Sequence, residues 1–589
     1  MKWNTIWNRE APTSSTHSAE QEQHQPADDI EKTTEPAVVV SDPDAPNPNV
    51  QYGVQAAEAV TAVWSKRSLI LTYICIFLVF FVNSFQQQMT SNLSAYVTSS
   101  FALHSLVSVT SVVSSIVGGV FKLPIAKLIN IWGRAEGFCF MVVLATLGII
   151  LMACCSNVQT YAAAQVFYWV GYDGMSYVLD VYIADTSDLK NRALWFAFST
   201  TPYIATTFAG PAAAEDFYEN TGGWRWAFGT FAIVVPIISM PIASIFFYNQ
   251  KKAKKLGVLV KQPSNRTLWE SVIFYAIEFD VIGLLLVSAG FSLFLLPFSL
   301  EAYQAEGWKA GMIIAMLVIG FLCLVAFPFY LRYSPKPFIP FHLLLDRTVL
   351  GACLLAGTLF ISFYIWDSYF STYLQVVNDL SLQDAGYVAN IYSIGSCFWA
   401  VVVGFLIRTS GSFKWLALCA LPLEFLGSGL MIHFRQPNQD IGYVVMCQIF
   451  IAFAGGTLVI CEEMAVMAAS EHEQVAVVLA LQALFSSIGG AIGSTISSAL
   501  WTHIYPKKLA EYLPESTKDQ ATTIYGSLDV QLSYPVGSPT RIAIQKAMGV
   551  AQKYMTITAT VILVLCIVEV MIWRNIKVKD FRQVKGTIA

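Results

Sequence analysis

Long apolar runs dominate this chain and limit what it can fold into. A helix that crosses the hydrocarbon core of a bilayer needs about 20 residues, and most of the runs reach that length. Of the 589 residues, 55% are apolar and 13% are charged, whereas about 25% of an ordinary soluble domain is charged. We therefore predict an all-α membrane protein with fourteen transmembrane helices, at 69–90, 104–126, 136–156, 158–182, 193–213, 224–248, 279–299, 309–331, 348–375, 385–408, 414–433, 440–468, 473–503 and 553–573.

Lys and Arg gather in the connections on one side of the predicted spans. The two largest groups follow the sixth run and the last run: Lys251, Lys252, Lys254 and Lys255, then Arg574, Lys577, Lys579 and Arg582. Cytoplasmic loops of membrane proteins carry an excess of these residues, so we expect both termini in the cytosol. The net charge of −4 and the lack of a basic face exclude a nucleic-acid-binding protein.

The loop after the second run indicates the fold. It reads KLPIAKLINIWGR, from Lys122 to Arg134, and it resembles the motif G-x-L-x-D-x-x-G-R-[RK] of the major facilitator superfamily. The loop after the tenth run, GFLIRTSGSFK from Gly404 to Lys414, resembles a degenerate copy of it eight helices later. The resemblance implies the major facilitator superfamily fold: two six-helix repeats with two helices inserted between them.

Four residues near these loops are expected to form a cytosolic latch. Gly133 permits a tight turn, while Lys127 and Arg134 can bind carboxylates at neighbouring helix ends, and Asp185 is the expected partner. The sequence departs from the family motif at one point, because its Asp is replaced by Asn130.

The repeat divides the chain into parts. Residues 1–64 are rich in Ser, Thr, Pro, Gln and acidic residues, and such a stretch cannot bury enough apolar surface to order itself. We expect a disordered cytosolic tail at 1–64, a six-helix bundle at 65–250, a cytosolic linker at 251–278, inserted helices 7 and 8 at 279–346, a second six-helix bundle at 347–580 with a long outer loop at 504–552, and a cytosolic tail at 581–589.

Several short blocks resemble the fungal siderophore–iron transporter family. They include DVYIADTS from Asp180, KPFIP from Lys336 and the outer-loop stretch YPVGSPTR from Tyr534, and the resemblance covers about residues 65–580. It implies proton-coupled symport of ferric siderophores, mostly hydroxamates such as ferrichromes, fusarinines and ferrioxamines, at a plasma membrane. An endosomal or vacuolar membrane is the alternative.

The expected cargo determines which side chains the carrier needs. A ferric trihydroxamate fills the octahedral shell of iron with oxygen, so we expect no cofactor and no metal ligands in the protein, and iron is carried only as the siderophore complex. Such a cargo calls for a wide cavity lined by aromatic and amide side chains. The predicted substrate-binding residues are Gln86, Gln87, Trp169, Tyr177, Tyr364, Trp366, Asp367 and Tyr369. Tyr369 fits an interfacial aromatic belt equally well.

Carboxylates inside the spans are the candidates for proton coupling. A charge in hydrocarbon costs several kcal/mol unless it faces water or a partner, and burial favours the protonated form of a carboxyl group. Asp173 and Asp180 lie seven residues apart in the fourth run, and Glu462 and Glu463 lie in its repeat counterpart, the twelfth. We predict that these four residues exchange the coupling proton.

The outer loop is longer than a passive connection requires. Tyr525, Tyr534 and Arg541 in this loop are predicted to form a gate that contacts the ligand at the outer mouth.

The sequence favours a monomeric importer whose partners are a ferric siderophore, protons and the lipid bilayer. The alternative is a proton-coupled exporter or exchanger of drugs or thiol peptides on the same fold. Drug/proton antiporters carry an Arg in R-x-x-Q-G of the fourth helix, and the matching stretch from Phe167 to Gly171 has none. An enzyme is not expected, because the spans contain no H-E-x-x-H motif and no nucleophile elbow.

Overall fold

The computed structural model describes residues 52–578 apart from 101–106, 220, 222, 258, 260–266, 302–303, 305, 335–336, 338, 340 and 472–473. All of these residues belong to one unit, Asp44–Ala589. Most of the predicted N-terminal tail, and the C-terminal tail from residue 579, lie outside the described residues.

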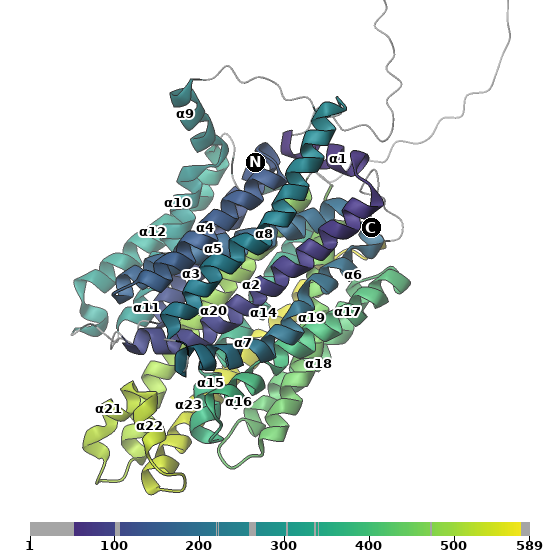
Figure 1. Cartoon of the computed structure of the whole chain (residues 1–589). Helices are drawn as coiled ribbons and strands as arrows, with labels where there is room; N and C mark the ends of the chain where they lie inside the picture. Colours follow the sequence, from purple (N-terminus) through teal and green to yellow (C-terminus); the bar gives the residue numbers. More distant parts are fainter. Residues whose placement is uncertain are drawn as a thin grey trace, which may run out of the picture. The chain divides into compact units, whose positions relative to one another are not determined.

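The regular elements of the described residues are all helices, apart from one isolated bridge between Ser412 and Lys577. In the first half (Figure 1) these are α1 (Tyr52–Val63), α2 (Lys66–Ser100), α3 (Val107–Ile131), α4 (Arg134–Cys154), α5 (Val158–Thr186), α6 (Leu189–Thr200), α7 (Pro202–Glu219) and α8 (Trp224–Lys255). The inserted segment contains α9 (Leu268–Glu278), α10 (Val281–Leu295), α11 (Pro297–Leu300), a 3-10 turn at Gly307–Lys309, α12 (Gly311–Tyr333) and α13 (Phe341–Leu344).

The second half follows the same plan with more breaks. It contains α14 (Arg347–Asp367), α15 (Phe370–Val377), α16 (Leu382–Ala389), α17 (Ile391–Ser410), α18 (Lys414–Phe434), α19 (Ile441–Ala468), α20 (Val475–Tyr512), α21 (Ala521–Gly526), α22 (Leu528–Ser533), α23 (Pro539–Ile562) and α24 (Val564–Ile572). We call α2–α8 the N-terminal bundle and α14–α24 the C-terminal bundle.

Local sequence explains where several helices begin. The side chain of Asn157 accepts a hydrogen bond from the Thr160 amide at the start of α5, and Asp346, Asp440 and Ser538 act in the same way at the starts of α14, α19 and α23. These short polar side chains satisfy amide groups that the first helical turn leaves without a partner.

Ten helices of the described residues are long and apolar enough to cross a membrane, and an eleventh span is formed if α9 and α10, bent by 51°, are counted together. The three remaining predicted runs correspond to α3, to α5, and to the pair α6 and α7. Helix α5 carries Asp173, Asp180 and Asp185, and Pro202 begins α7 directly after α6 ends. The all-helical prediction is confirmed, whereas the count of fourteen stays a prediction.

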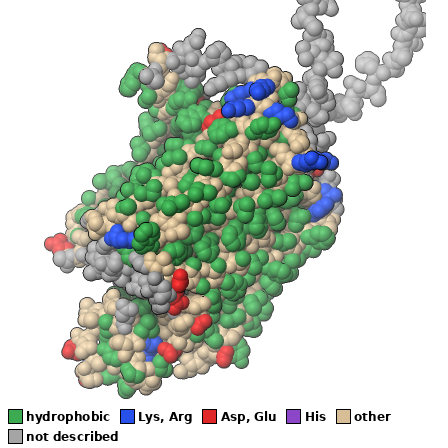
Figure 2. Space-filling view, viewed as in Figure 1, with side chains coloured by type: hydrophobic (Ala, Val, Ile, Leu, Met, Phe, Trp, Pro, Cys, Tyr) green, Lys and Arg blue, Asp and Glu red, His purple; other side chains and the backbone are tan. Residues whose placement is uncertain are grey.

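Large apolar side chains cover the outward faces of these helices, as expected for contact with lipid. On α8 they include Ile233, Ile237 and Met240, all more than half exposed. Figure 2 shows hydrophobic side chains over most of the face drawn, with Lys and Arg gathered toward one end. The last turn of α8, with Lys252, Lys254 and Lys255, contributes to this basic end.

The predicted extent of the disordered tail is wrong, because residues 52–63 form α1. A Cβ atom on Gly53 would lie 2.1 Å from the carbonyl oxygen of Ile129, so α1 rests directly on the backbone at the end of α3. Lys252 donates to the carbonyl of Val63 at 2.9 Å, and Trp64 packs edge-on against Tyr182. Small residues such as Ala56 and Ala59, both buried, let this short helix bury a face that its composition did not suggest.

The predicted outer loop is also mostly helical. Helix α20 continues to Tyr512, α21 and α22 follow, and α23 begins at Pro539. Tyr505, Leu509 and Ile524 belong to one buried cluster with Phe370 and Tyr373. The segment is therefore a packed cap on α15, and α22 and α23 lie beside α15 in Figure 1.

Helices α4 and α5 approach closely through two glycines. A Cβ atom on Gly171 would lie 2.2 Å from the backbone nitrogen of Ala145, and one on Gly148 would lie 2.3 Å from that of Tyr168. Small residues at such crossings let helix backbones pack tightly in a membrane.

We predict that Gly171→Val lowers the free energy of unfolding by about 1–3 kcal/mol, the usual cost of overpacking a core. Gly229→Val is the matched control, since a Cβ atom at Gly229 has nothing within 4 Å. Thermal unfolding of both purified variants in detergent measures the difference, and equal transition temperatures would contradict the prediction.

Candidate functional site

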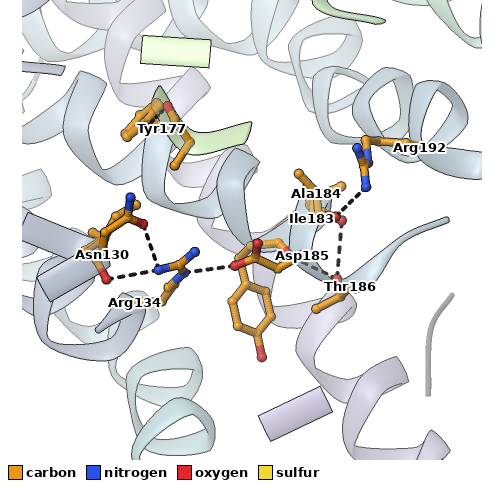
Figure 3. Close-up of polar contacts among 11 residues, drawn as sticks. Asn130, Arg134, Tyr177, Ile183, Ala184, Asp185, Thr186 and Arg192 are labelled. Carbon is orange, nitrogen blue, oxygen red and sulfur yellow. Dashed lines mark hydrogen bonds and ion pairs between the residues drawn. The ribbon is translucent and has the colours of Figure 1, made fainter. Parts of the chain in front are cut away.

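The cytosolic latch is built around Arg134 (Figure 3). Its Nε lies 2.9 Å from Oδ2 of Asp185, and both side chains are buried, at 7% and 3% exposure. Its Nη1 donates to the Ile129 carbonyl at 3.1 Å and to Oδ1 of Asn130 at 3.0 Å. The predicted Arg134–Asp185 contact is thus present, and Asn130 still binds the arginine at the position where the family motif has Asp.

Gly133 and Lys127 complete the latch region. Gly133 has φ 126°, a backbone conformation that favours glycine, and a Cβ atom there would lie 2.5 Å from Oε2 of Glu136. Lys127 donates to the backbone carbonyls of Glu278 at 2.8 Å and Pro337 at 3.4 Å. This lysine therefore connects α3 to the inserted helices, a role that the sequence did not indicate.

Close contacts join the two bundles between α5 and α20 and between α6 and α17. The Tyr177 hydroxyl donates to the carbonyl of Ala476 at the start of α20, and a Cβ atom on Gly404 would lie 2.9 Å from Cα of Leu194. Tyr177 is 4% exposed. Its hydroxyl lies in the seam between the bundles, and its role in substrate binding stays a prediction.

One face of α5 keeps partial exposure within the helix bundle. Trp169, Asp173, Ser176 and Asp180 are all half-buried, and their spacing of three or four residues places them on one side of the helix; we call them the inner stripe. The side chain of Asp173 is 26% exposed, and its Oδ1 lies 3.9 Å from Nζ of Lys122.

Gly118 makes room for this ion pair, since a Cβ atom there would lie 2.8 Å from Oδ2 of Asp173. The sequence interpretation did not select Lys122, although a lysine near the end of an apolar run is itself a signal for a functional partner.

The predicted amide residues of α2 form a network with three tyrosines. Gln86 accepts a hydrogen bond from Tyr168 at 2.6 Å, and Gln87 accepts from Tyr172 at 3.1 Å and from Tyr203 at 2.7 Å. The sequence interpretation missed these tyrosines, because only the folded structure brings α5 and α7 against α2. The sequence pattern that could have indicated them is the set of aromatic residues near Trp169 at helical spacing.

The predicted residues of α14 are divided between two environments. Tyr364 and Asp367 are half-buried, and Tyr364 lies against Gly490 of α20. Trp366 is 2% exposed, and Tyr369 stacks on Trp501 with ring centroids 4.3 Å apart. Tyr369 therefore belongs to the packed outer core and does not form part of an interfacial belt.

The two adjacent glutamates of α19 face different surroundings. Glu462 is 1% exposed, and its Oε1 accepts from Nε2 of Gln482 at 3.0 Å. Glu463 is half-buried and lies within electrostatic range of Asp180 in the other bundle. The structure thus brings one carboxylate from each bundle, Asp180 and Glu463, toward the same interior region.

Two further buried glutamates were not selected from the sequence. Glu569 of α24 accepts from the Thr358 hydroxyl at 2.7 Å, and Glu424 of α18 is 5% exposed. Among the described residues, no group of three or more His, Cys, Asp or Glu side chains is arranged to hold a metal ion.

The three predicted gate residues differ in their exposure and partners. Tyr534 is half-buried and donates to Oε1 of Gln520 at 2.9 Å, and Tyr525 packs against Tyr505 with ring centroids 5.7 Å apart. Arg541 is 1% exposed and donates to the carbonyls of Val376 and Gln531. Arg541 therefore fixes the cap to α15, and the contact of the three gate residues with ligand stays a prediction.

Comparison with known proteins identifies the class. The model of the Major Facilitator Superfamily matches residues 76–377. A peptide transporter POT shares the fold, with a TM-score of 0.52 and 14% identity over 88% of this chain and 99% of that chain. The human organic anion transporter MFSD10 (TETRAN) shares it with a TM-score of 0.51 and 10% identity over 84% and 99%. The fold and the motif loop define a transporter of the major facilitator type.

Curated relatives identify the family within the superfamily to which this chain belongs. The chain is 56% identical to "MFS siderochrome iron transporter 1" of Ajellomyces capsulatus over 92% of both chains. It is 48% identical to "MFS siderochrome iron transporter D" of Aspergillus fumigatus over 92% and 91%, and 45% identical to "Siderophore iron transporter mirB" of Emericella nidulans over 93% and 91%. The chain therefore belongs to the major facilitator superfamily, in the family of fungal siderochrome iron transporters.

We predict that Arg134→Ala lowers the free energy of unfolding by about 3–5 kcal/mol, because it leaves the buried Asp185 carboxylate without its cation. Lys190→Ala, at an exposed position in the first turn of α6, is the control and leaves stability within about 0.5 kcal/mol. Thermal unfolding of the purified proteins measures both effects. A loss for Arg134→Ala no larger than the control would show that the latch does not stabilise the fold.

Proposed function

We propose that this protein is a proton-coupled symporter that imports ferric hydroxamate siderophore complexes by alternating access. The observation that carries this proposal is the inner stripe of α5, where Asp173 and Asp180 keep partial exposure while Asp180 lies within electrostatic range of Glu463 of the other bundle. Carboxylates shared between the two moving halves of a carrier can link proton binding to the movement.

The names of the relatives support the substrate class. Each of the three relatives above is named a siderochrome or siderophore iron transporter and matches at least 92% of this chain. A ferric ion with three singly charged hydroxamates is neutral overall. Asp173 of the inner stripe is paired with Lys122, and this ion pair carries no net charge. The amide of Gln87 and the phenol of Tyr203, which are half-buried and hydrogen-bonded to each other, suit a polar but uncharged cargo.

Contacts near both ends of the bundles support alternating access. The cytosolic seam includes Tyr177 and Ala476. At the other end, the rings of Phe208 and Tyr387 lie 5.6 Å apart, and a Cβ atom on Gly386 would lie 3.5 Å from Pro211. Opening one set of contacts while the other stays closed would expose the inner stripe to one side at a time.

The setting follows from the same proposal. We infer a monomer in the plasma membrane with both termini in the cytosol, in keeping with the basic end formed by α8. The protein needs no resident cofactor, because iron enters as the complete siderophore complex.

Expression in a host that lacks its own siderophore carriers tests the function. We expect uptake of ⁵⁵Fe loaded on trihydroxamates such as ferrichrome, fusarinine or ferrioxamine types, and we expect a proton uncoupler to abolish it. Uptake that survives the uncoupler would refute proton coupling, and export of preloaded complex without uptake would favour an exporter.

The coupling residues are tested by Asp173→Asn and Glu463→Gln, which keep side-chain size and remove the ionisable group. We expect each variant to reduce uphill uptake at least tenfold at pH 5 and pH 7 and to retain exchange of labelled for unlabelled complex, since exchange needs no net proton movement. Asp384→Asn, in the first turn of α16, is the control. Wild-type uptake by both variants at both pH values would refute this assignment.

A further inference from the structure

Arg435 is a fully buried cation at the outer end of α18, where Phe434 ends the helix. Its Nη1 donates to the carbonyl of Trp366 at 2.7 Å. The guanidinium lies 4.2 Å from the ring centroid of Phe370 and 5.4 Å from that of Tyr373. Aromatic faces stabilise a cation in such a place, but they do not satisfy its hydrogen-bond donors.

The other donors of this guanidinium are buried without a partner. Nε and Nη2 of Arg435 have no hydrogen-bond acceptor among the described residues. Together these two atoms form the side-on edge of the guanidinium, which binds a carboxylate through two parallel hydrogen bonds. Burial lowers the pKa of Arg435 to about 10, against the opposing effects of Tyr373 and Asp367, so the group remains a cation near neutral pH. A buried charge with two open donors is costly and calls for an explanation.

Asp367 is a carboxylate within electrostatic range of Arg435. It directly follows Trp366, whose carbonyl Arg435 already binds, and it is half-buried. No hydrogen bond joins Asp367 to Arg435 in the described arrangement, in which Nε and Nη2 remain open.

The helical geometry is interrupted directly after Asp367, and we call this interruption the break. Helix α14 ends at this residue, Tyr369 has the non-helical angles φ −119° and ψ 19°, and α15 begins at Phe370. On the outer side of the break, side chains of α23 hold the carbonyls of α15: Arg541 binds Val376 at 3.1 Å, and Gln545 binds Val376 at 3.2 Å. Side chains of α23 thus hold the carbonyls of α15 on one side of the break, and α14 packs against α20 and α23 on the other side.

We propose that the carboxylate of Asp367 docks on the Nε–Nη2 edge of Arg435 in a second arrangement of this break, and that the pair positions the outer end of α14–α15. The inference rests on the proposed function in one respect, since transport requires the outer end to open and close. In the described arrangement Asp367 is half-buried and Arg435 has an open edge; in the second arrangement both charges are satisfied by one bidentate ion pair. Arg435 and Asp367 are positioning residues in this scheme and make no contact with iron.

The test measures the accessibility of α15 without any siderophore. Thr372→Cys, at a half-buried position of α15, is labelled from outside with a membrane-impermeant maleimide, and the wild-type chain gives the background of its eleven native cysteines. We expect Asp367→Asn and Arg435→Lys each to change the labelling rate about tenfold in the same direction, the effect of losing a charge-assisted hydrogen bond. The double variant should label like Arg435→Lys alone, because both changes remove one interaction.

Controls separate this pairing from general damage. Asp440→Asn, which keeps an N-cap side chain at the start of α19, should leave labelling unchanged, and all variants should match the wild type in surface amount. Additive effects of the two substitutions, or unchanged labelling in Asp367→Asn, would overturn the proposal. The proposal would also be overturned if Asp367→Asn changed only the ferric trihydroxamate concentration that half-saturates uptake. Asp367 would then be a contact of the ligand. Labelling as expected in a chain that imports no ferric hydroxamate would refute the proposed function and leave the pairing intact.

Discussion

The cost of a charge in hydrocarbon governs the structure of this transporter. A charged side chain within a span must find a partner or face water, and the described residues show both solutions. Arg134 and Asp185 satisfy each other in a buried pair, whereas Asp173 combines a distant lysine with partial exposure. The first solution holds the start of α4 to the end of α5. The second leaves a group that can exchange its partner, as a transport cycle requires.

The helices can bend at their interruptions when a charged group exchanges its partner. The break between α14 and α15 adjoins Asp367, and the cap built from α21–α23 holds the outer side through backbone carbonyls. Because carbonyl contacts do not depend on the side chains of α15, the cap fixes the position of that segment.

Several features could be predicted from sequence because they depend on local chemistry. The motif loop predicted the turn at Gly133 and the Arg134–Asp185 contact, since the motif specifies both a glycine with unusual φ and a cation beside it. The surroundings of other residues could not be predicted, because they depend on which helices meet. Tyr177 and Arg541 were expected to face ligand, but one lies in the seam between the bundles and the other is buried under the cap. The Gln86 and Gln87 network required tyrosines of α5 and α7 whose positions no local pattern revealed.

The sequence by itself determined that the chain is an all-helical membrane transporter, because hydrocarbon requires long apolar helices and allows few charges. It also determined which polar residues lie within the apolar runs and therefore need a partner or contact with water. Only the tertiary structure decided how those residues pair: Asp173 with Lys122, Asp180 near Glu463, and Arg435 with an open edge beside Asp367. The physical reason is that these partners come from helices far apart in sequence. The role of a polar side chain in a membrane depends on which charged group the fold places nearest to it.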